Sequence, residues 1–229
     1  MRLIKLNKRW MEEILETLKV HYGRSLVLKP SLTPFEMLIK TILSQNTTDL
    51  NANKAFNRLR ERFKVEPKAL ARADLGIIRE CIKVAGLGNI KAKRIKEVSM
   101  LVYSKFGGDL SSILSLPLKK ARSTLIEMPG IGYKTADVIL TFAGEKPIVP
   151  IDTHLFTVGM RLGVFNSKRK YEAARESLEK LIPAEKRAEA HLLLLAHGKA
   201  VCTAKRAWCS RCPISKLCMK IGVTKELMG

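Results

Sequence analysis

Apolar residues recur every three or four positions along most of the chain, which is the spacing of an amphipathic helix. The first segment of this kind carries Trp10, Met11, Ile14, Leu15 and Leu18 and is followed by Gly23. No segment shows the regular alternation of apolar and polar residues that is typical of a strand. The pattern therefore predicts an all-α fold.

Local signals mark where the predicted helices begin and end. Thr33 and Glu36 have the spacing of a capping box, and Pro34 stands at the first helical position. Thr48 and Asp49 provide a second start signal. Glycine and proline residues end the segments, and further helices are expected across residues 74–84, 90–106, 118–127, 152–162, 167–181 and 185–200.

A break in the helical pattern divides the chain at residues 144–151. This segment contains Pro147 and Pro150, and two prolines so close together cannot continue a helix. We therefore expect the chain to form two helical lobes, with a boundary in this segment.

The charge balance points to a polyanionic partner. The 229 residues include 42 Lys and Arg against 21 Asp and Glu, a formal net charge of +21. Such an excess attracts nucleic acid, and the alternatives are that it serves a membrane surface or simply solubility. A hydrophobic content of 46% excludes wholesale disorder. Because no long apolar segment or secretory leader is visible, we expect an intracellular protein that does not insert into a membrane.

Four of the five cysteines are crowded into one short segment: Cys202, Cys209, Cys212 and Cys218. Four thiolates at such spacing can converge on one zinc ion or on an iron–sulfur cluster. Zinc usually takes two close pairs of ligands, and only one close pair is present here, so the spacing favours iron–sulfur. Lys205 and Arg206 lie inside this segment and suit either a solvated basic face or a surface that binds phosphate.

A second motif lies at residues 125–136, where two helical segments flank Pro129, Gly130 and Gly132. Backbone N–H groups at the start of the second helix can bind a phosphate oxygen without reading bases. The alternative is an ordinary interhelical turn, and the positive charge of the chain favours the DNA interpretation. A similar glycine-bearing turn at residues 86–91 is either an internal repeat or a coincidence.

Lys134 and Asp152 offer complementary chemistry. Lys134 falls in the first turn of the second hairpin helix, where the helix dipole disfavours an ammonium ion and so favours a nucleophilic amine. Asp152 stands at a predicted helix start, where it serves as an N-cap or, if it faces the lysine, stabilises positive charge that develops on a sugar. A surface lysine and a capping aspartate are the purely structural alternatives.

Together these motifs closely resemble the endonuclease III family, the helix-hairpin-helix DNA glycosylases that carry a [4Fe-4S] cluster. The resemblance covers residues 43–49, 128–140 and 149–154 and all four clustered cysteines. It implies a six-helix lobe at residues 32–146 and a cluster lobe formed by residues 1–31 and 147–229, with a DNA-binding cleft between the lobes.

The resemblance implies base excision DNA repair by a bifunctional glycosylase and abasic-site lyase that removes oxidised pyrimidines such as thymine glycol. Lys134 would attack C1′ of the damaged nucleotide and form a Schiff base, β-elimination would then cut the strand, and Asp152 would assist. The implied cofactor is a [4Fe-4S] cluster bound by the four cysteines. The implied partner is double-stranded DNA that contains damaged bases or abasic sites, bound by a monomer.

The resemblance also assigns residues to the substrate pocket and to DNA contacts. Ser44, Asp49 and His154 are expected in the pocket, and Leu87 is similar to the residue that wedges into the base stack. The other expected DNA contacts are Gln45, Asn46, Gly130, Gly132, Thr135, Lys205 and Arg206.

One segment departs from the family pattern. Where the family reads Leu-Ser-Ala-Gln, this chain reads Leu43-Ser44-Gln45-Asn46, so a glutamine stands one position early and Asn46 takes its aligned place. The sequence leaves open which of the two side chains fills the space that a flipped base vacates.

Three other functions remain open at this level. The first is a glycosylase of the same superfamily for uracil or thymine opposite guanine, against which Lys134 argues because those relatives carry a different residue there. The second is a non-catalytic DNA-binding iron–sulfur protein, which a strand-cleavage assay would distinguish. The third is a zinc-bound RNA-binding module, which a brown protein absorbing near 400 nm would exclude, an optical expectation taken from the family.

Overall fold

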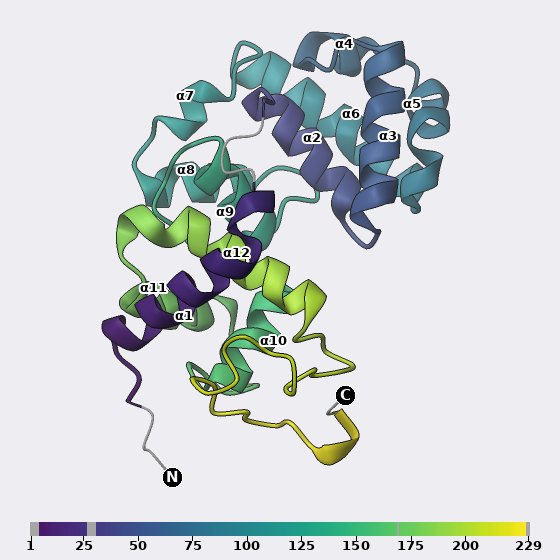
Figure 1. The fold of residues 1–229 in the computed structure, drawn as a ribbon. Helices are drawn as coiled ribbons and strands as arrows, with labels where there is room; N and C mark the ends of the chain where they lie inside the picture. The colour runs from purple at the N-terminus through teal and green to yellow at the C-terminus, as the bar shows by residue number, and fades with distance from the viewer. Residues whose placement is uncertain (1–4, 27–30, 169, 228–229) are drawn as a thin grey trace. The chain divides into compact units, whose positions relative to one another are not determined.

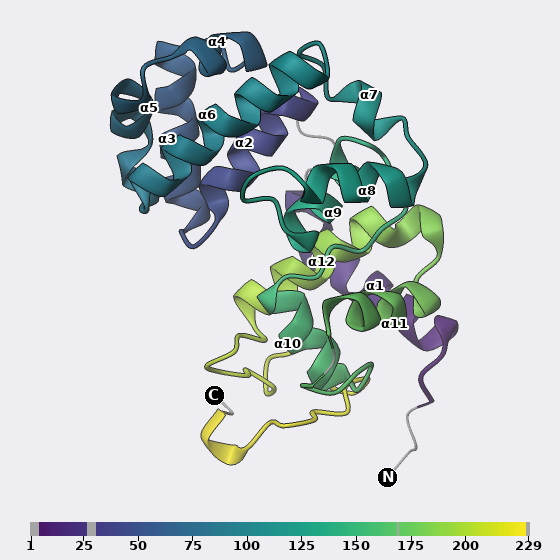
Figure 2. The same cartoon turned by 180° about the vertical axis from the view of Figure 1, so that it is seen from behind.

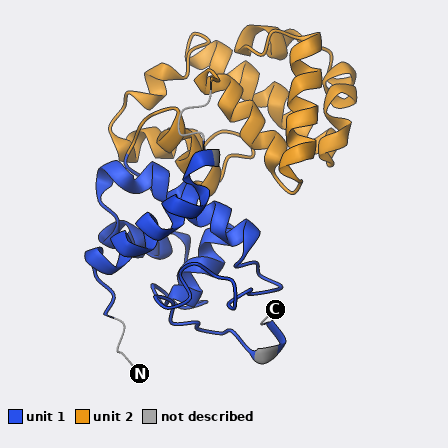
Figure 3. Ribbon diagram, viewed as in Figure 1, with its two compact units in different colours: residues 1–29, 147–229 blue, residues 30–146 orange. Residues whose placement is uncertain are grey.

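The computed structural model describes residues 5–26, 31–168 and 170–227. The described residues form helices joined by turns, with no strand and one isolated bridge between Cys202 and Ala207 (Figures 1 and 2). The predicted all-α fold is confirmed. The chain divides into two compact units, of which unit 2 spans Pro30–Lys146 and unit 1 contains the rest (Figure 3).

Unit 2 holds eight α-helices among its described residues, and two of them are short. The helices are α2 (Pro34–Ser44), α3 (Asp49–Arg62), α4 (Pro67–Arg72), α5 (Leu75–Ile82), α6 (Gly88–Lys105), α7 (Ser111–Leu114), α8 (Leu118–Ile126) and α9 (Tyr133–Phe142), with the 3-10 turn η2 (Lys83–Ala85) after α5. The short helices α4 and α7 have 6 and 4 residues. The other six correspond in number to the six-helix lobe implied by the resemblance.

The long helix α6 organises unit 2, since it packs against α2, α4 and α5. Helix α2 also contacts α3 and α9, and it buries Leu38, Ile39 and Ile42 completely. The capping box predicted at its start is present, because the Thr33 hydroxyl accepts from the Glu36 amide at 3.2 Å and the Glu36 carboxylate accepts from the Thr33 amide at 2.9 Å. The capped helix α2 thus leads directly into residues 45–48.

Unit 1 is built around α12. Its helices are α1 (Lys8–Tyr22), α10 (Thr153–Leu162), α11 (Tyr171–Leu181) and α12 (Arg187–Ala200), with the 3-10 turns η1 (Gly23–Ser25), η3 (Ala184–Lys186) and η4 (Lys225–Leu227). Helix α12 packs against α1 and α10. The apolar stripe of the first predicted helix forms part of this core, where Met11, Ile14 and Leu18 are fully buried. Segments from the two ends of the sequence therefore share one core.

The boundaries of several elements differ from the predictions. The helix expected from residue 167 begins at Tyr171, because Ser167 and Lys168 form a turn, while residue 169 lies outside the described residues. The segment expected as one helix at 74–84 is α5 followed by η2, and the sequence pattern did not indicate α4 or α7. None of the helices in the described part of the chain combines the length and apolar character required to cross a bilayer.

Candidate active site and cysteine cavity

Two features stabilise the hairpin turn between α8 and α9. One is the left-handed backbone at a glycine, and the other is a buried ion pair. Gly130 has a φ of +76°, and a Cβ atom there would lie 2.5 Å from Cδ of Arg94. The position therefore requires glycine on two grounds. Behind the turn, the Arg122 guanidinium donates to the fully buried carboxylate of Asp137 at 2.6 and 2.9 Å, which joins α8 to α9.

The start of α9 leaves its first backbone N–H groups without a side-chain cap, because the N-cap residue is Gly132. Nothing lies within 4 Å of the position that a Cβ atom would take at Gly132. Such an open helix start is suited to binding an anion. Lys134 is the second residue of this helix and its side chain is half-buried. The structure thus places the candidate nucleophile at the positive end of a helix, as predicted.

Gln45 is half-buried, and its side-chain amide is hydrogen-bonded to the hairpin. Its amide Nε2 donates to the Gly130 carbonyl at 3.1 Å and lies 3.4 Å from the Thr135 hydroxyl, and its Oε1 accepts from the Arg94 guanidinium at 3.1 Å. Asn46, the next residue, is exposed and adopts a left-handed conformation with φ of +52°. The two residues that the sequence could not separate therefore have different environments.

The other predicted residues of unit 2 lie at element ends. Ser44 ends α2 and its hydroxyl donates to the Thr41 carbonyl at 2.8 Å, while Asp49 is the exposed first residue of α3. Leu87 is the N-cap of α6, left-handed and 50% exposed. An exposed leucine held in a strained conformation at a loop tip is suited to contact with a partner.

Asp152 and His154 lie at the start of α10 in unit 1. The Asp152 carboxylate is the N-cap of α10 and accepts from the Leu155 amide at 2.8 Å. The capping role predicted for Asp152 is therefore confirmed. The cap uses one carboxylate oxygen, Oδ1. His154 is packed against α12 at Gly198, where a Cβ atom would come within 2.8 Å of the histidine Cβ. Asp152 and Lys134 belong to different units of the structure.

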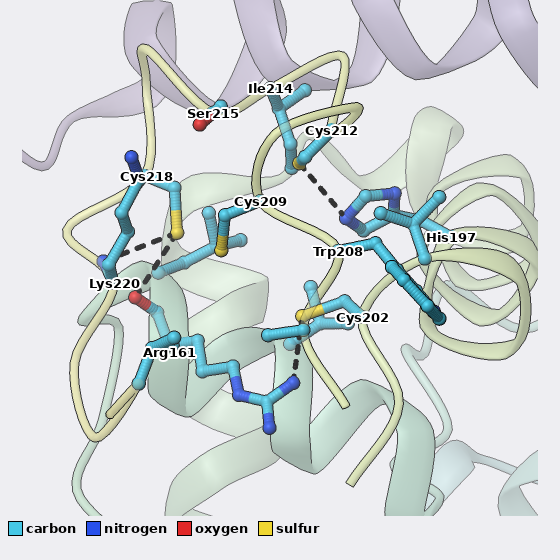
Figure 4. Close-up of a pocket in the computed structure, with 15 residues that line it drawn as sticks. Arg161, His197, Cys202, Trp208, Cys209, Cys212, Ile214, Ser215, Cys218 and Lys220 are labelled. Atoms are coloured by element: carbon cyan, nitrogen blue, oxygen red, sulfur yellow. Dashed lines mark hydrogen bonds between the residues drawn. The ribbon is translucent and has the colours of Figure 1, made fainter. Parts of the chain in front are cut away.

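All four clustered cysteines line one cavity of unit 1 (Figure 4). None of them is in a disulfide. The side chains of Val158, Leu162 and Ile214 contribute aliphatic walls. Burial raises the pKa of the Cys218 thiol to about 11, and it also raises the pKa values of Cys202 and Cys212. These thiols are therefore protonated at neutral pH unless a cation stabilises the thiolates.

Two buried basic residues contact the cysteines, and sequence reasoning identified neither. Arg161 donates to the Cys202 sulfur at 3.2 Å and to the Thr203 carbonyl at 2.8 Å, and its Nε atom is buried without a hydrogen-bond partner. His197 Nε2 lies 3.8 Å from the Cys212 sulfur (Figure 4). Burial, with a smaller contribution from His21, lowers the pKa of His197 to about 4, so its ring is neutral at neutral pH.

The donor set of this cavity fits a metal centre bound by sulfur. Four thiols face an apolar cavity, and the Arg161 guanidinium donates to one of the sulfurs, that of Cys202. No carboxylate of the described residues forms an ion pair with Arg161. The Arg161 guanidinium lowers the pKa of Cys202, but burial outweighs it and the net shift of that pKa is upward. As they lie, no three His, Cys, Asp or Glu side chains of the described residues are grouped closely enough to hold a metal ion.

The basic segment between Cys202 and Cys209 forms an exposed loop beside the cavity. Lys205 and Arg206 are exposed, and Thr203 closes a turn by accepting from the Arg206 amide at 3.0 Å. Trp208 lines the cavity, and its ring stacks with two guanidinium groups, those of Arg206 at 5.5 Å and Arg211 at 4.5 Å from the ring centroid. Trp208 therefore orders part of the basic surface.

Comparison with known proteins assigns this chain to a family. Residues 39–184 match the family model described as HhH-GPD superfamily base excision DNA repair protein. The chain is 37% identical over 185 residues to endonuclease III of Sulfolobus acidocaldarius, an alignment that covers 80% of this chain and 81% of the relative. The chain belongs to the endonuclease III family of HhH-GPD base excision repair proteins. This confirms the resemblance on which the expected enzyme class depends.

Two further comparisons extend the match over nearly the whole chain. Endonuclease III of Escherichia coli is 32% identical over 215 residues, which cover 93% of this chain and 96% of the relative. A solved structure of a trapped endonuclease III–DNA covalent intermediate superposes with a TM-score of 0.82 at 27% identity, and it covers 94% of this chain and 97% of that chain. Like its family, this protein acts as a DNA glycosylase and lyase in base excision repair.

Proposed function

We propose that this endonuclease III family member removes oxidised pyrimidines of the thymine glycol type from duplex DNA, with Lys134 as the nucleophile. The observation that carries the proposal is the position of Lys134, half-buried in the first turn of α9 directly after Gly132, the N-cap residue that provides no side-chain cap. A helix start disfavours an ammonium ion and so favours the reactive amine. A phosphate bound at the same helix start would bring the sugar of its nucleotide near this amine.

The reaction follows from the chemistry of a primary amine at a sugar carbon. The Lys134 amine forms a bond to C1′ while the glycosidic C1′–N bond breaks, and the base departs with the bonding electrons and takes up a proton. Opening of the sugar ring gives an imine between Lys134 and C1′. Loss of a C2′ proton then expels the 3′ phosphate by β-elimination, and hydrolysis of the imine regenerates the amine.

Asp152 is proposed as the anion that stabilises the positive charge developing on the sugar. One of its carboxylate oxygens accepts the Leu155 amide hydrogen bond that caps α10, which holds the group in one orientation. Ser44, Asp49 and His154 are proposed to line the pocket for the extruded base.

Asn46 and Leu87 are proposed to enter the DNA when the damaged base is flipped out. Both are exposed and left-handed at loop tips. We propose that Gln45 does not take that role, because both ends of its amide are engaged with Gly130 and Arg94. Gln45 instead supports the hairpin. Flipping costs about a few kcal/mol and least for damaged bases, which contributes to selectivity.

The DNA backbone is proposed to be held by the hairpin around Gly130, Gly132 and Thr135 and by the basic loop that carries Lys205 and Arg206. Backbone N–H groups and cationic side chains are the usual phosphate contacts, and they carry no sequence information. A damage-specific enzyme needs such contacts, because its lesion occurs in any sequence. We propose that a monomer of the protein makes them.

We further propose that Cys202, Cys209, Cys212 and Cys218 hold a [4Fe-4S] cluster. Such a cluster would draw the four thiols together and order the loop between Cys202 and Cys209. Its expected contribution is structural, and Arg161 would balance part of its negative charge. Iron and sulfide analysis of the purified protein tests this proposal, and stoichiometric zinc without iron would contradict it.

Borohydride trapping tests the role of Lys134. We expect the protein to form a covalent adduct on duplex DNA containing thymine glycol and on the same duplex with an abasic site. Lys134→Ala should form none, because it lacks the amine that makes the imine. Its affinity for the duplex should stay within about threefold, since phosphate contacts are spread over several residues.

Lys105→Ala is the matched control, because Lys105 is an exposed lysine at the end of α6, and it should trap normally. An adduct with Lys134→Ala would overturn the assignment of the nucleophile. An adduct on the abasic duplex alone would overturn the substrate class. Excision of uracil or thymine opposite guanine without any adduct would favour a monofunctional mismatch glycosylase, and no reaction at all would favour a DNA-binding protein.

A further inference from the structure

A lysine is buried inside unit 2, and it has no place in the chemistry above. Lys91 on α6 is only 1% exposed. Its ammonium donates to two backbone carbonyls, those of Leu43 and Ala85, both at 2.9 Å. Burial lowers the pKa of Lys91, and so does nearby Arg94 to a lesser degree. Among the described residues no carboxylate forms an ion pair with Lys91, so the two carbonyls offset the cost of burying its charge.

Both carbonyls lie at helix ends. Leu43 is in the last turn of α2, and Ala85 is the last residue of η2. Carbonyl groups at a helix end lack intrahelical partners and carry partial negative charge, so an ammonium is a favourable partner for them. One cation therefore joins the ends of two elements that are 42 residues apart in sequence, between Leu43 and Ala85.

The chain leaves each of these helix ends toward a proposed DNA-inserting residue. Asn46 follows Leu43 by three residues, and Leu87 follows Ala85 by two. Both adopt a φ of +52°, and both side chains are exposed. Arg94, one turn after Lys91 on α6, adds a second tie by donating to Gln45 at 3.1 Å. Side chains on α6 thus form hydrogen bonds to the segments from which both loops start.

We infer that Lys91 is a positioning residue that fixes the spacing between the Asn46 and Leu87 loops, so that both side chains enter the duplex together when a base is extruded. The inference rests on the proposed function of the two loops. Loss of the ammonium leaves two buried carbonyls unpaired and frees the loops to shift independently. A misplacement of about 1 Å is enough to cost up to roughly a hundredfold in rate.

Lys91→Met removes the ammonium and keeps the bulk of the side chain. We expect single-turnover excision of thymine glycol from duplex DNA to fall by roughly tenfold or more. Cleavage of the same duplex with a preformed abasic site should stay within about threefold of wild type, because no base has to be extruded. Lys96→Met is the matched control, since Lys96 lies on the same helix and donates to the Ala73 carbonyl at 2.6 Å, away from both loops.

A double-mutant cycle separates positioning from a general loss of stability. The Lys91→Met effect on excision should shrink to less than about threefold in the Asn46→Ala, Leu87→Ala background, where no side chain is left to position. A structural role would lower excision equally in both backgrounds, and that result, or an equal loss on the abasic duplex, would overturn the inference.

If Lys91→Met does not fold, the inference is tested with the variants at the exposed residues Asn46 and Leu87 alone. The losses of Asn46→Ala and Leu87→Ala should then be strongly non-additive, because the two loops act as one unit, and strictly additive losses would overturn the inference. Failure of the proposed function is distinguishable, since in that case the wild-type protein itself would not excise thymine glycol.

Discussion

At the scale of single residues, the two glycines of the hairpin have different requirements. Gly130 is left-handed and its Cβ position is occupied by the Arg94 side chain, whereas Gly132 has a φ of −98° and open space around it. We expect Gly130→Ala to lower the free energy of unfolding by at least about 1–2 kcal/mol, from the left-handed backbone alone. Denaturation with urea, followed by circular dichroism, measures this change.

Gly132→Ala, two positions further along the chain, is the internal control. Its backbone conformation is available to alanine, so the free energy of unfolding should change by less than about 0.5 kcal/mol. Equal losses in the two variants would show that the hairpin is sensitive to any side chain, and would remove the specific role of the Gly130 and Arg94 contact.

At the scale of elements, the carboxylate at the start of α10 has a structural role and, in our proposal, a chemical one. Asp152 caps the helix through the Leu155 amide, and asparagine caps a helix about as well as aspartate. Asp152→Asn should therefore keep the thermal stability of wild type while excision falls by roughly a hundredfold, because it removes the negative charge that we propose stabilises the sugar. Thermal unfolding and single-turnover excision measure the two effects separately.

Asp152→Ala removes the cap as well as the charge. It should show the same loss of excision together with a loss of about 1 kcal/mol in stability. If Asp152→Asn keeps full activity, the residue is a helix cap and nothing more.

At the scale of the whole molecule, the net charge of +21 governs how the protein meets DNA. Because binding releases counterions from the phosphates, affinity should fall by roughly 10³-fold or more between 50 and 200 mM salt, on damaged and undamaged duplexes alike. Fluorescence anisotropy over a salt series measures the slope. Lys205→Ala and Arg206→Ala should each reduce that slope by about 1. An affinity independent of salt would contradict the proposed backbone contacts.

The sequence alone was sufficient to predict the fold class and several local features of this protein. The helical class, the capping box at Thr33, the hairpin glycines and the cysteine set follow from local spacing, since each depends on residues close to one another in the sequence. The position of Lys134 at a helix start is of the same kind. Short helices such as α4 and the true start of α11 escaped prediction, because packing rather than a local signal decides them.

The tertiary structure alone decided the contacts between segments distant in sequence. Gln45 is engaged by Gly130 and Arg94, which are 85 and 49 residues away. Lys91 is buried on two carbonyls of other elements, and Arg161 reaches Cys202 across 41 residues. Hydrophobic periodicity reports which face of a helix is buried, but it does not report which polar group meets a buried cation there. These contacts form only when the helices pack. They give Gln45 hydrogen-bond partners while Asn46 stays exposed, and they bring the two carbonyls to Lys91.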